Sequence, residues 1–417
     1  MNKIRNHITV FEHETLRFDK GEKRISKEQL IALQRYHGEG VPYFSLCHNG
    51  VKFNEYVGAI QIGNTLIEVL PKTDKEQDDE NIWRGVLIGI LKVVHRFNIK
   101  STSASLLKIK PNTILDLYFE LFVKELEYLL HNGLCKQYRK KEGNVLALKG
   151  NLQFGAHIQK NLIHKERFFV RHTAFDFEHK LHFILYKTLR LIKKINTNAE
   201  LHSRIAALLL HFPEMPDIKV TSSSFDNIIL NRKTQIYERS LEIARLLLLK
   251  YHPDVFKGKN NVLALMFDMN QLWEQFVFQS LKKEMNGDVI VKKQQSRYFW
   301  KPEGRKRRSI QPDINIIAGN NTYVLDTKWK AIRNKPAIED IRQMYAYNHY
   351  FRANKVALVF PGSFDDSPGD FIDIDNQRKA SGYKCGLLFI KPNYNIRDWQ
   401  KEISKKITDW IIADMVH

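Results

Sequence analysis

Two aspartates and one lysine stand in a short segment whose pattern predicts two β-strands. The segment SIQPDINIIAGNNTYVLDTKWK contains Asp313, Asp326 and Lys328. The Gly-Asn-Asn tripeptide between the two aspartates predicts a hairpin turn, which would make Asp313 and Asp326 neighbours on adjacent antiparallel strands. Asp326 and Lys328 are two residues apart and would therefore share one face of their strand.

The chemistry of this group depends on its apolar surroundings. Carboxylates among residues such as Ile314, Ile316 and Val324 are unfavourable unless a metal or hydrogen bonds satisfy them. Two carboxylates suit a hard divalent cation, first of all Mg²⁺, which can activate a bound water and neutralise charge on a phosphate. Lys328 could orient that water or stabilise negative charge. The alternative is an ordinary hairpin with a surface Asp–Lys pair, because a D-x-K tripeptide also arises by chance.

Two flanking helices add polar residues to this group. Glu274 lies in the apolar stretch LWEQFVF, which predicts a helix before the strands. After the hairpin, Gln343 and Tyr347 are spaced i, i+4 and would share one helix face. Taken alone, Glu274 could be a solvated helix carboxylate, and the Gln-Tyr pair could be ordinary helix residues at chance spacing.

The order of these motifs is more specific than any one of them. Glu274, Pro312-Asp313, Asp326-Thr327-Lys328 and Gln343…Tyr347 resemble the PD-(D/E)XK nuclease superfamily in its RecB-like branch. The resemblance implies hydrolysis of DNA phosphodiesters that depends on Mg²⁺, with Mn²⁺ as a possible substitute. It implies these roles: Asp313 and Asp326 as metal ligands, Glu274 as an accessory ligand or holder of a metal-bound water, the Thr327 carbonyl as a backbone ligand, Lys328 as the catalytic lysine, and Gln343 and Tyr347 as residues that contact DNA or brace the site.

The remainder of the chain is similar to the McrC family, the nuclease subunit of McrBC-type, modification-dependent restriction systems. The similarity rests on VGAIQIGNTLIEVLPK at 57–72, ALKG at 147–150 and LMFDMNQLWEQF at 265–276. It implies a partner, a McrB-like hexameric AAA+ GTPase that recognises and translocates DNA. It also implies an N-terminal region that docks into this motor and stimulates its hydrolysis.

The chain has no GxxxxGK[ST] motif, so we expect it to bind no nucleotide in the P-loop manner. Any GTP dependence would then come from the partner. The residue that would reach the motor cannot be identified from the sequence. Three cations in the N-terminal region, Lys72, Arg84 and Arg96, are expected to be solvated surface charges.

The net charge of +20 calls for a polyanionic partner. The excess of positive charge is greatest at 289–335, which contains twelve Lys and Arg residues and three acids, a net charge of +9. The expected DNA-binding residues there are Arg305, Lys306, Arg307, Arg308 and Lys330, each able to neutralise a phosphate in a salt-dependent manner. Trp300 and Trp329 lie among them and either stack on DNA or belong to the core.

The element pattern predicts an α/β multidomain protein. We expect a strand-rich N-terminal module at 1–110, a mainly helical middle domain at 111–260, and a C-terminal α/β domain at 261–417. The resemblances imply that the first docks the AAA+ partner and that the last is a PD-(D/E)XK nuclease domain. In the N-terminal module, Gly63-Asn64 predicts a hairpin between strands at 56–61 and 65–70. In the middle domain, periodic apolar residues predict one long helix over 227–251.

The spacing of the cysteines and histidines predicts no disulfide or metal site. Cys47, Cys135 and Cys385 are far apart, which argues against a disulfide framework and a cysteine zinc site and suits a reducing cytoplasm. His157, His164, His172 and His179 show no HExxH or HxH spacing and are expected to be ordinary. We find neither a signal peptide nor an apolar run long enough to span a membrane, so a cytoplasmic protein without membrane contact is expected.

The sequence therefore predicts a Mg²⁺-dependent DNA endonuclease subunit of a GTP-driven antiviral defence complex. Two alternatives stay open. One is a RecB-like repair nuclease that acts without a motor. The other is a non-catalytic adaptor that binds DNA or activates the motor, against which the complete set of Asp313, Asp326 and Lys328 argues.

Overall fold

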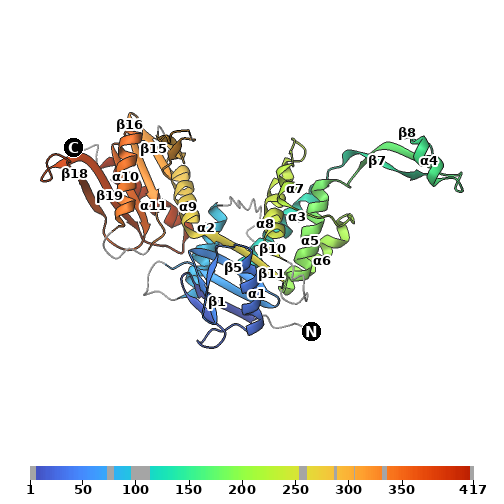
Figure 1. Cartoon of the computed structure of the whole chain (residues 1–417), viewed down its shortest axis with the longest axis horizontal. Helices are drawn as coiled ribbons and strands as arrows, with labels where there is room; N and C mark the ends of the chain where they lie inside the picture. The colour runs from blue at the N-terminus through green and yellow to red at the C-terminus, as the bar shows by residue number, and fades with distance from the viewer. Residues whose placement is uncertain are drawn as a thin grey trace. The chain divides into compact units, whose positions relative to one another are not determined.

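The computed structural model describes residues 6–72, 79–94, 113–252, 261–285, 289–304, 306–330 and 336–413. Contacts between Cα atoms divide the chain into two compact units (Figure 1). One consists of Asn6–Ile109 with Met266–His417, and the other of Lys110–Leu265 with Met1–Arg5. The first and third of the three expected domains thus contribute to the same unit. The division into three domains stays a prediction.

The N-terminal part of the first unit is rich in strands, as predicted. Strands β5 (Tyr56–Ile62) and β6 (Thr65–Leu70) form the expected antiparallel hairpin, with Ile62 opposite Thr65 and Gly63 at φ 55° in the turn. Strand β1 (Asn6–Phe11) runs parallel to β6. A separate three-stranded sheet has the order β2 (Thr15–Arg17), β4 (Gly50–Phe53), β3 (Phe44–Cys47).

Two helices accompany these strands. Helix α1 (Lys27–Gly38) begins at a capping box, in which the Ser26 side chain accepts from the Gln29 N–H and Gln29 accepts from the Ser26 N–H. Helix α2 (Glu80–Val94) is strongly apolar along the face that includes Trp83, Leu87 and Ile90. Arg96, expected to be a solvated surface charge, lies outside the described residues.

A six-stranded sheet forms the centre of the C-terminal part. Its order is β12 (Val289–Lys293), β15 (Ile314–Ala318), β16 (Asn321–Thr327), β17 (Lys355–Pro361), β19 (Ala380–Ile390), β18 (Ser367–Ile372). The three strands β16, β17 and β19 are parallel, and the remaining pairs are antiparallel. Buried Val, Ala, Leu and Phe residues fill β17, as expected for a strand covered on both faces.

Helices cover both faces of this sheet. Helix α10 (Ile338–Phe351) packs its Met344, Tyr347 and Phe351 on the face that carries Val324. Adjacent strand residues point to opposite faces, so Tyr323 points to the face opposite Val324. The Tyr323 ring contacts Trp410 of helix α11 (Ile396–Ile412), which therefore lies on that second face. Helix α9 (Met269–Glu284) joins α11 through Trp273, Phe276 and Trp399. Figure 1 shows these helices around the sheet.

Close contacts join the N-terminal and C-terminal parts of this unit. A Cβ atom on Gly89 of α2 would lie 2.1 Å from the Ile396 Cγ1 of α11, so only glycine permits this approach. The Met269 N–H, at the start of α9, donates to the Glu55 carbonyl over 3.0 Å. The Trp329 indole N–H donates to the Glu12 Oε1 over 2.8 Å. Segments about 300 residues apart in sequence therefore share one core.

The second unit combines a helical bundle with a protruding sheet (Figure 1). The bundle contains α3 (Ile114–Asn132), α5 (Lys180–Ile195), α6 (Ala199–His211), α7 (Ser222–Asp226) and α8 (Glu238–Leu249). Strands β7 (Gln137–Val145) and β9 (Phe168–Asp176) pair in register over nine residues and extend from the bundle to β8 (Asn151–Leu152) and α4 (Phe154–Lys160). Strands β10 (Tyr251–His252) and β11 (Val262–Asp268) pair as well.

The prediction of one helix over 227–251 is wrong for the first half of that range. The helix α8 begins only at Glu238, after a 3₁₀ turn at Gln235–Tyr237. The cause is Asn231, whose side-chain oxygen accepts from the Lys233 and Thr234 N–H groups and so favours a turn over a helix. Ile229, counted as a core position of that helix, is 93% exposed. No helix in the described ranges is both long and apolar enough to cross a bilayer.

Candidate active site

The two aspartates lie opposite one another at one end of the β15–β16 hairpin. The register pairs Ile314 with Leu325, which places Asp313 across from Asp326. One carboxylate oxygen of Asp313, Oδ2, accepts from the Thr327 backbone N–H over 2.7 Å and from the Thr327 hydroxyl over 2.8 Å. Asp326 is 1% exposed. The hairpin thus brings the aspartates together as the sequence predicted, and Thr327 orients the first of them.

Lys328 lies beside Asp326, as their spacing predicted. Its Nζ is 2.7 Å from the Asp326 Oδ2 and 3.9 Å from the Oδ1 of Asp340 in α10. Asp340 is buried and was missed by the sequence analysis. A signal was present, because Asp340 precedes Gln343 by three residues and so lies on the same helix face. The lysine therefore lies between two carboxylates.

Glu274 reaches the same region from α9. Its Oε1 lies 3.3 Å from the Lys293 Nζ of β12 and accepts from the Gln294 side-chain amide over 2.8 Å. Gln294 has a positive φ of 51°, and its N–H donates to the Asp313 carbonyl. The structure thus couples the predicted Glu274 to the Asp313 strand through two residues that the sequence did not single out.

Gln343 and Tyr347 close the α10 side of the group. The Gln343 amide donates to the Tyr347 hydroxyl over 2.6 Å and lies 3.5 Å from the Asp326 Oδ1. The Tyr347 hydroxyl donates to the Gln311 carbonyl over 2.9 Å, two residues before Asp313. Tyr347 is 2% exposed, so its geometry is that of a brace.

The electrostatics show more negative charge than the neighbouring lysines balance. Burial and the nearby Asp313 raise the pKa of Asp326 to about 7, even though Lys328 acts in the opposite direction. Burial and Asp313 also raise the pKa of Glu274. Burial alone lowers the pKa of Lys328, but pairing with Asp326 outweighs it and the net shift is upward. Three carboxylates converge on one region that favours an added positive charge.

The donor set fits a hard divalent cation. Carboxylate oxygens of Asp313, Asp326 and Glu274 are the ligands that Mg²⁺ and Mn²⁺ prefer, and neither sulfur nor imidazole takes part. The observation that supports a cation here is that the buried Asp326 lies directly across from Asp313, because a bound metal would supply positive charge between the two carboxylates.

The basic run lies on a hairpin next to this region. Strand β13 (Arg297–Trp300) pairs with β14 (Arg308–Ile310), and Gly304, at φ 65°, lies in the turn. The residues Lys306, Arg307 and Arg308 are exposed, and Arg305 lies outside the described residues. The Arg307 guanidinium lies over the Tyr298 ring at 5.1 Å. Lys330 lies 3.5 Å from the Asp340 Oδ2 while its side chain stays half exposed.

The two tryptophans of this region differ. Trp300 is 58% exposed on β13 and available to a ligand. Trp329 is 6% exposed and bonded to Glu12, so it belongs to the core and cannot stack on DNA. Arg333 and Lys335, also in the basic segment, lie outside the described residues.

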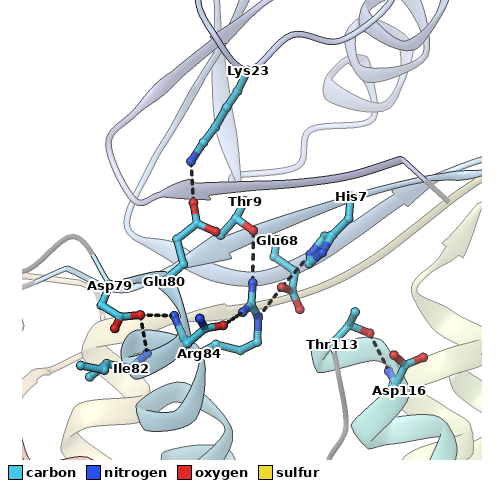
Figure 2. Close-up of polar contacts among 11 residues, drawn as sticks. His7, Thr9, Lys23, Glu68, Asp79, Glu80, Ile82, Arg84, Thr113 and Asp116 are labelled. Carbon is cyan, nitrogen blue, oxygen red and sulfur yellow. Dashed lines mark hydrogen bonds and ion pairs between the residues drawn. The ribbon is translucent and has the colours of Figure 1, made fainter.

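Arg84 is not the solvated surface charge that the sequence predicted. Its guanidinium donates to the buried Glu68 from Nε over 2.8 Å, and to the Asn81 and Thr9 side chains (Figure 2). The His7 ring lies 2.8 Å from the same Glu68 oxygen. Only 13% of the Arg84 side chain is exposed, because the buried carboxylate of β6 holds it. Lys72 lies over the Phe11 ring at 4.9 Å.

Residues 51–361, which are 311 of the 417 residues, match the family described as McrBC 5-methylcytosine restriction system component. The chain belongs to this family. The resemblance to McrC that the motifs indicated is thereby confirmed. Among curated proteins, no relative matches the sequence.

A solved structure shares the fold of this McrBC component. One chain of the assembly described as a half-complex of Thermococcus gammatolerans McrB AAA+ hexamers with bound McrC matches with a TM-score of 0.70 and 20% identity. The match covers 97% of this chain and 100% of that one. At such identity it establishes the fold alone. A chain of the Thermococcus gammatolerans McrBC complex matches with a TM-score of 0.49 and 21% identity, over 67% of this chain and 88% of its own.

Proposed function

We propose that this chain is the endonuclease subunit of a GTP-driven, modification-dependent restriction complex, and that it hydrolyses phosphodiester bonds of double-stranded DNA by PD-(D/E)XK chemistry. The observation that carries the proposal is the convergence of Glu274, Asp313 and Asp326 with Lys328 at one end of a hairpin. Membership of a restriction-system family supports a nuclease in general. The geometry of this group supports the particular chemistry.

The roles follow from the positions of the residues. Asp313 and Asp326 would hold Mg²⁺, with the Thr327 carbonyl and Glu274 as further ligands or as acceptors for its water. Bound there, the cation would supply an activated water and neutralise charge on the scissile phosphate. Thr327 fixes the Asp313 carboxylate through two hydrogen bonds. Tyr347 fixes the segment before Asp313 through the Gln311 carbonyl, and Gln343 orients the Asp326 carboxylate.

Lys328 would act as a cation. Its contacts with Asp326 at 2.7 Å and Asp340 at 3.9 Å favour the protonated ammonium group. A lysine held in this way can orient the attacking water and stabilise negative charge that develops on the phosphate, but is a poor proton acceptor. The exposed residues Lys306, Arg307 and Arg308 would bind the DNA backbone without reading its sequence.

The proposed partner is a McrB-like hexameric AAA+ GTPase. The assembly whose chain shares this fold is described as McrB AAA+ hexamers with bound McrC. The absence of a P-loop motif in the sequence supports a division in which the partner binds the nucleotide and recognises the modified DNA. We further propose that the N-terminal module docks on the motor and stimulates its hydrolysis.

The test is plasmid cleavage with Mg²⁺, on methylated and unmethylated DNA, with and without the neighbouring AAA+ GTPase and GTP. Wild type is compared with Asp326→Ala and with the control Asp370→Ala, which changes an exposed carboxylate on the edge strand β18. Cleavage that requires Asp326, the partner and GTP, and that survives Asp370→Ala, is the expected result.

Two other outcomes would replace the proposal. Cleavage by the chain alone that still requires Asp326 would identify a RecB-like nuclease of the repair type. No cleavage under any condition, with partner GTPase activity still stimulated, would identify a non-catalytic adaptor. Unchanged cleavage by Asp326→Ala would remove the assignment of the site.

A further inference from the structure

A second group of potential ligands lies in the helical unit, far in sequence from the acidic site. The side chains of Cys135, His179 and His182 each offer one ligand atom, and these atoms lie within 4.8 Å of one another. The two imidazole centroids are 3.9 Å apart, and the Cys135 Sγ lies 3.9 Å from the Nε2 edge of the His179 ring, whose other nitrogen, Nδ1, has the lone pair for a metal. The histidines are buried and Cys135 is half-buried.

The hydrogen bonds around the histidines suit metal ligands. The His182 Nδ1 donates to the Phe177 carbonyl over 2.7 Å, which makes its Nε2 an acceptor, and a bound metal would replace the Tyr237 hydroxyl that lies 3.0 Å from this nitrogen. Metal-bound histidines are commonly oriented in this way by a backbone carbonyl. The His179 Nε2 donates to the Cys135 carbonyl over 2.9 Å, and its Nδ1 is buried without a hydrogen-bond partner among the described residues. A buried nitrogen lone pair with no partner is costly unless a cation or a donor meets it.

Both rings are buried beside one another and bonded to backbone carbonyls, which fixes their orientation. Tyr237 lies beside the group, with its hydroxyl 3.0 Å from the His182 Nε2 and 2.9 Å from the Cys135 backbone nitrogen.

We propose that Cys135, His179 and His182 bind one Zn²⁺ ion, with a water beside Tyr237 in the fourth position. One thiolate and two imidazoles select Zn²⁺ over Mg²⁺, because they are soft to borderline donors. The group is separate from the acidic site, whose donors are all oxygen. The sequence spacing gave no sign of it, since the strands β7 and β9 lie between Cys135 and His179 and fold back to join them.

The position of the group indicates a structural role. Cys135 precedes β7 by two residues, and His179 follows β9 by three. The pair Gln137–Asp176 ends this sheet at the same place, where Arg139 also binds Asp176 and Glu178. A metal held here fastens both strands of the protruding sheet to the start of α5, in which His182 lies. It therefore fixes the base of that sheet on the helical bundle.

The test uses the full chain carrying Asp326→Ala, so that the acidic site does not contribute to the readings. We expect roughly one zinc per chain by mass spectrometry of the purified protein. After the zinc is removed, Co²⁺ should give a near-ultraviolet thiolate-to-cobalt band and the strong visible bands of a four-coordinate site. Zn²⁺ should then bleach these bands and raise the melting temperature.

Three further variants decide which residues bind. Cys135→Ser should lose the thiolate band, while the control Cys47→Ser, which changes another half-buried cysteine, should keep it. His182→Gln should weaken Co²⁺ binding by at least roughly 100-fold. Far-ultraviolet circular dichroism checks folding. A wild-type chain with no zinc and no thiolate band, or an unchanged band in Cys135→Ser, would overturn the proposal.

Discussion

Two buried carboxylates in the same unit serve different purposes. Glu68 is 0% exposed, and Arg84 and His7 both contact its Oε2 at 2.8 Å (Figure 2). Asp326 is 1% exposed, and Lys328, which pairs with it in the part of the chain that the structure describes, also faces Asp340, while Asp313 lies opposite. The first carboxylate is compensated within the protein and stabilises the fold. The second shares its lysine with another carboxylate, and in the proposed function a bound cation would compensate it further.

The largest expected effect is on catalysis. Asp326→Asn should reduce Mg²⁺-dependent cleavage by roughly 1,000-fold or more, because a cation ligand is lost. Its melting temperature above pH 7 should equal or exceed that of wild type, because burial already raises the pKa of Asp326 to about 7 and the charge destabilises the fold. Calorimetry and plasmid cleavage measure the two effects. A strongly destabilised Asp326→Asn would show that Asp326 is structural, as Glu68 is.

Removing the partner of the compensated Glu68 should lower stability, not cleavage. Arg84→Met removes the guanidinium from the buried Glu68 and should cost about 3–5 kcal/mol of unfolding free energy. Lys23→Met is the control, since Lys23 pairs with Glu80 at the surface and its loss should cost less than about 1 kcal/mol. Denaturant unfolding measures both. Equal effects would mean that Arg84 is not the main stabiliser of Glu68.

A third buried carboxylate gives a pH dependence. Burial raises the pKa of Glu12 to about 7 from 4.5, so the folded state holds its proton more tightly than the unfolded state does. Stability from this group is therefore lost as pH rises from about 4.5 through 7, by about 3 kcal/mol in total. Glu12→Gln should flatten that part of the stability–pH curve. An unchanged slope would show that Glu12 titrates normally.

Removing the brace should have a moderate effect. Tyr347→Phe loses the bond to the Gln311 carbonyl and the partner of Gln343, each about 1 kcal/mol. Cleavage should fall roughly 5- to 30-fold, in kcat more than in KM, if the tyrosine positions the aspartates and does not hold DNA. A loss confined to KM would instead indicate direct contact with the substrate.

The smallest effect concerns the hairpin. Replacing Arg307 and Arg308 by alanine should lower the slope of log Kd against log salt by roughly one for each arginine. Filter binding with DNA of two unrelated sequences measures the slope. The effect should be equal for both sequences, and a change limited to one of them would indicate base contacts.

Local pattern and motif order predicted much of the candidate site. The hairpin turn sets the register that places Asp313 opposite Asp326, and the i, i+4 spacing places Gln343 beside Tyr347. Contacts between distant segments left no local pattern: Arg84 with Glu68, Trp329 with Glu12, and Cys135 with His179 all depend on the tertiary fold. The predicted helix over 227–251 was wrong because the side chain of Asn231 competes with the helix for backbone hydrogen bonds.

The first unit is discontinuous, since Asn6–Ile109 is completed only by Met266–His417. During synthesis, Gly89 of α2 and Glu12 emerge from the ribosome long before Ile396 and Trp329, which cover them. At typical elongation rates the 156 residues from Lys110 to Leu265 alone delay the arrival of Met266 by roughly 10–30 s. Throughout that interval the apolar face of α2 is without its final neighbours, which makes the nascent chain a natural client for chaperones that shield such surfaces.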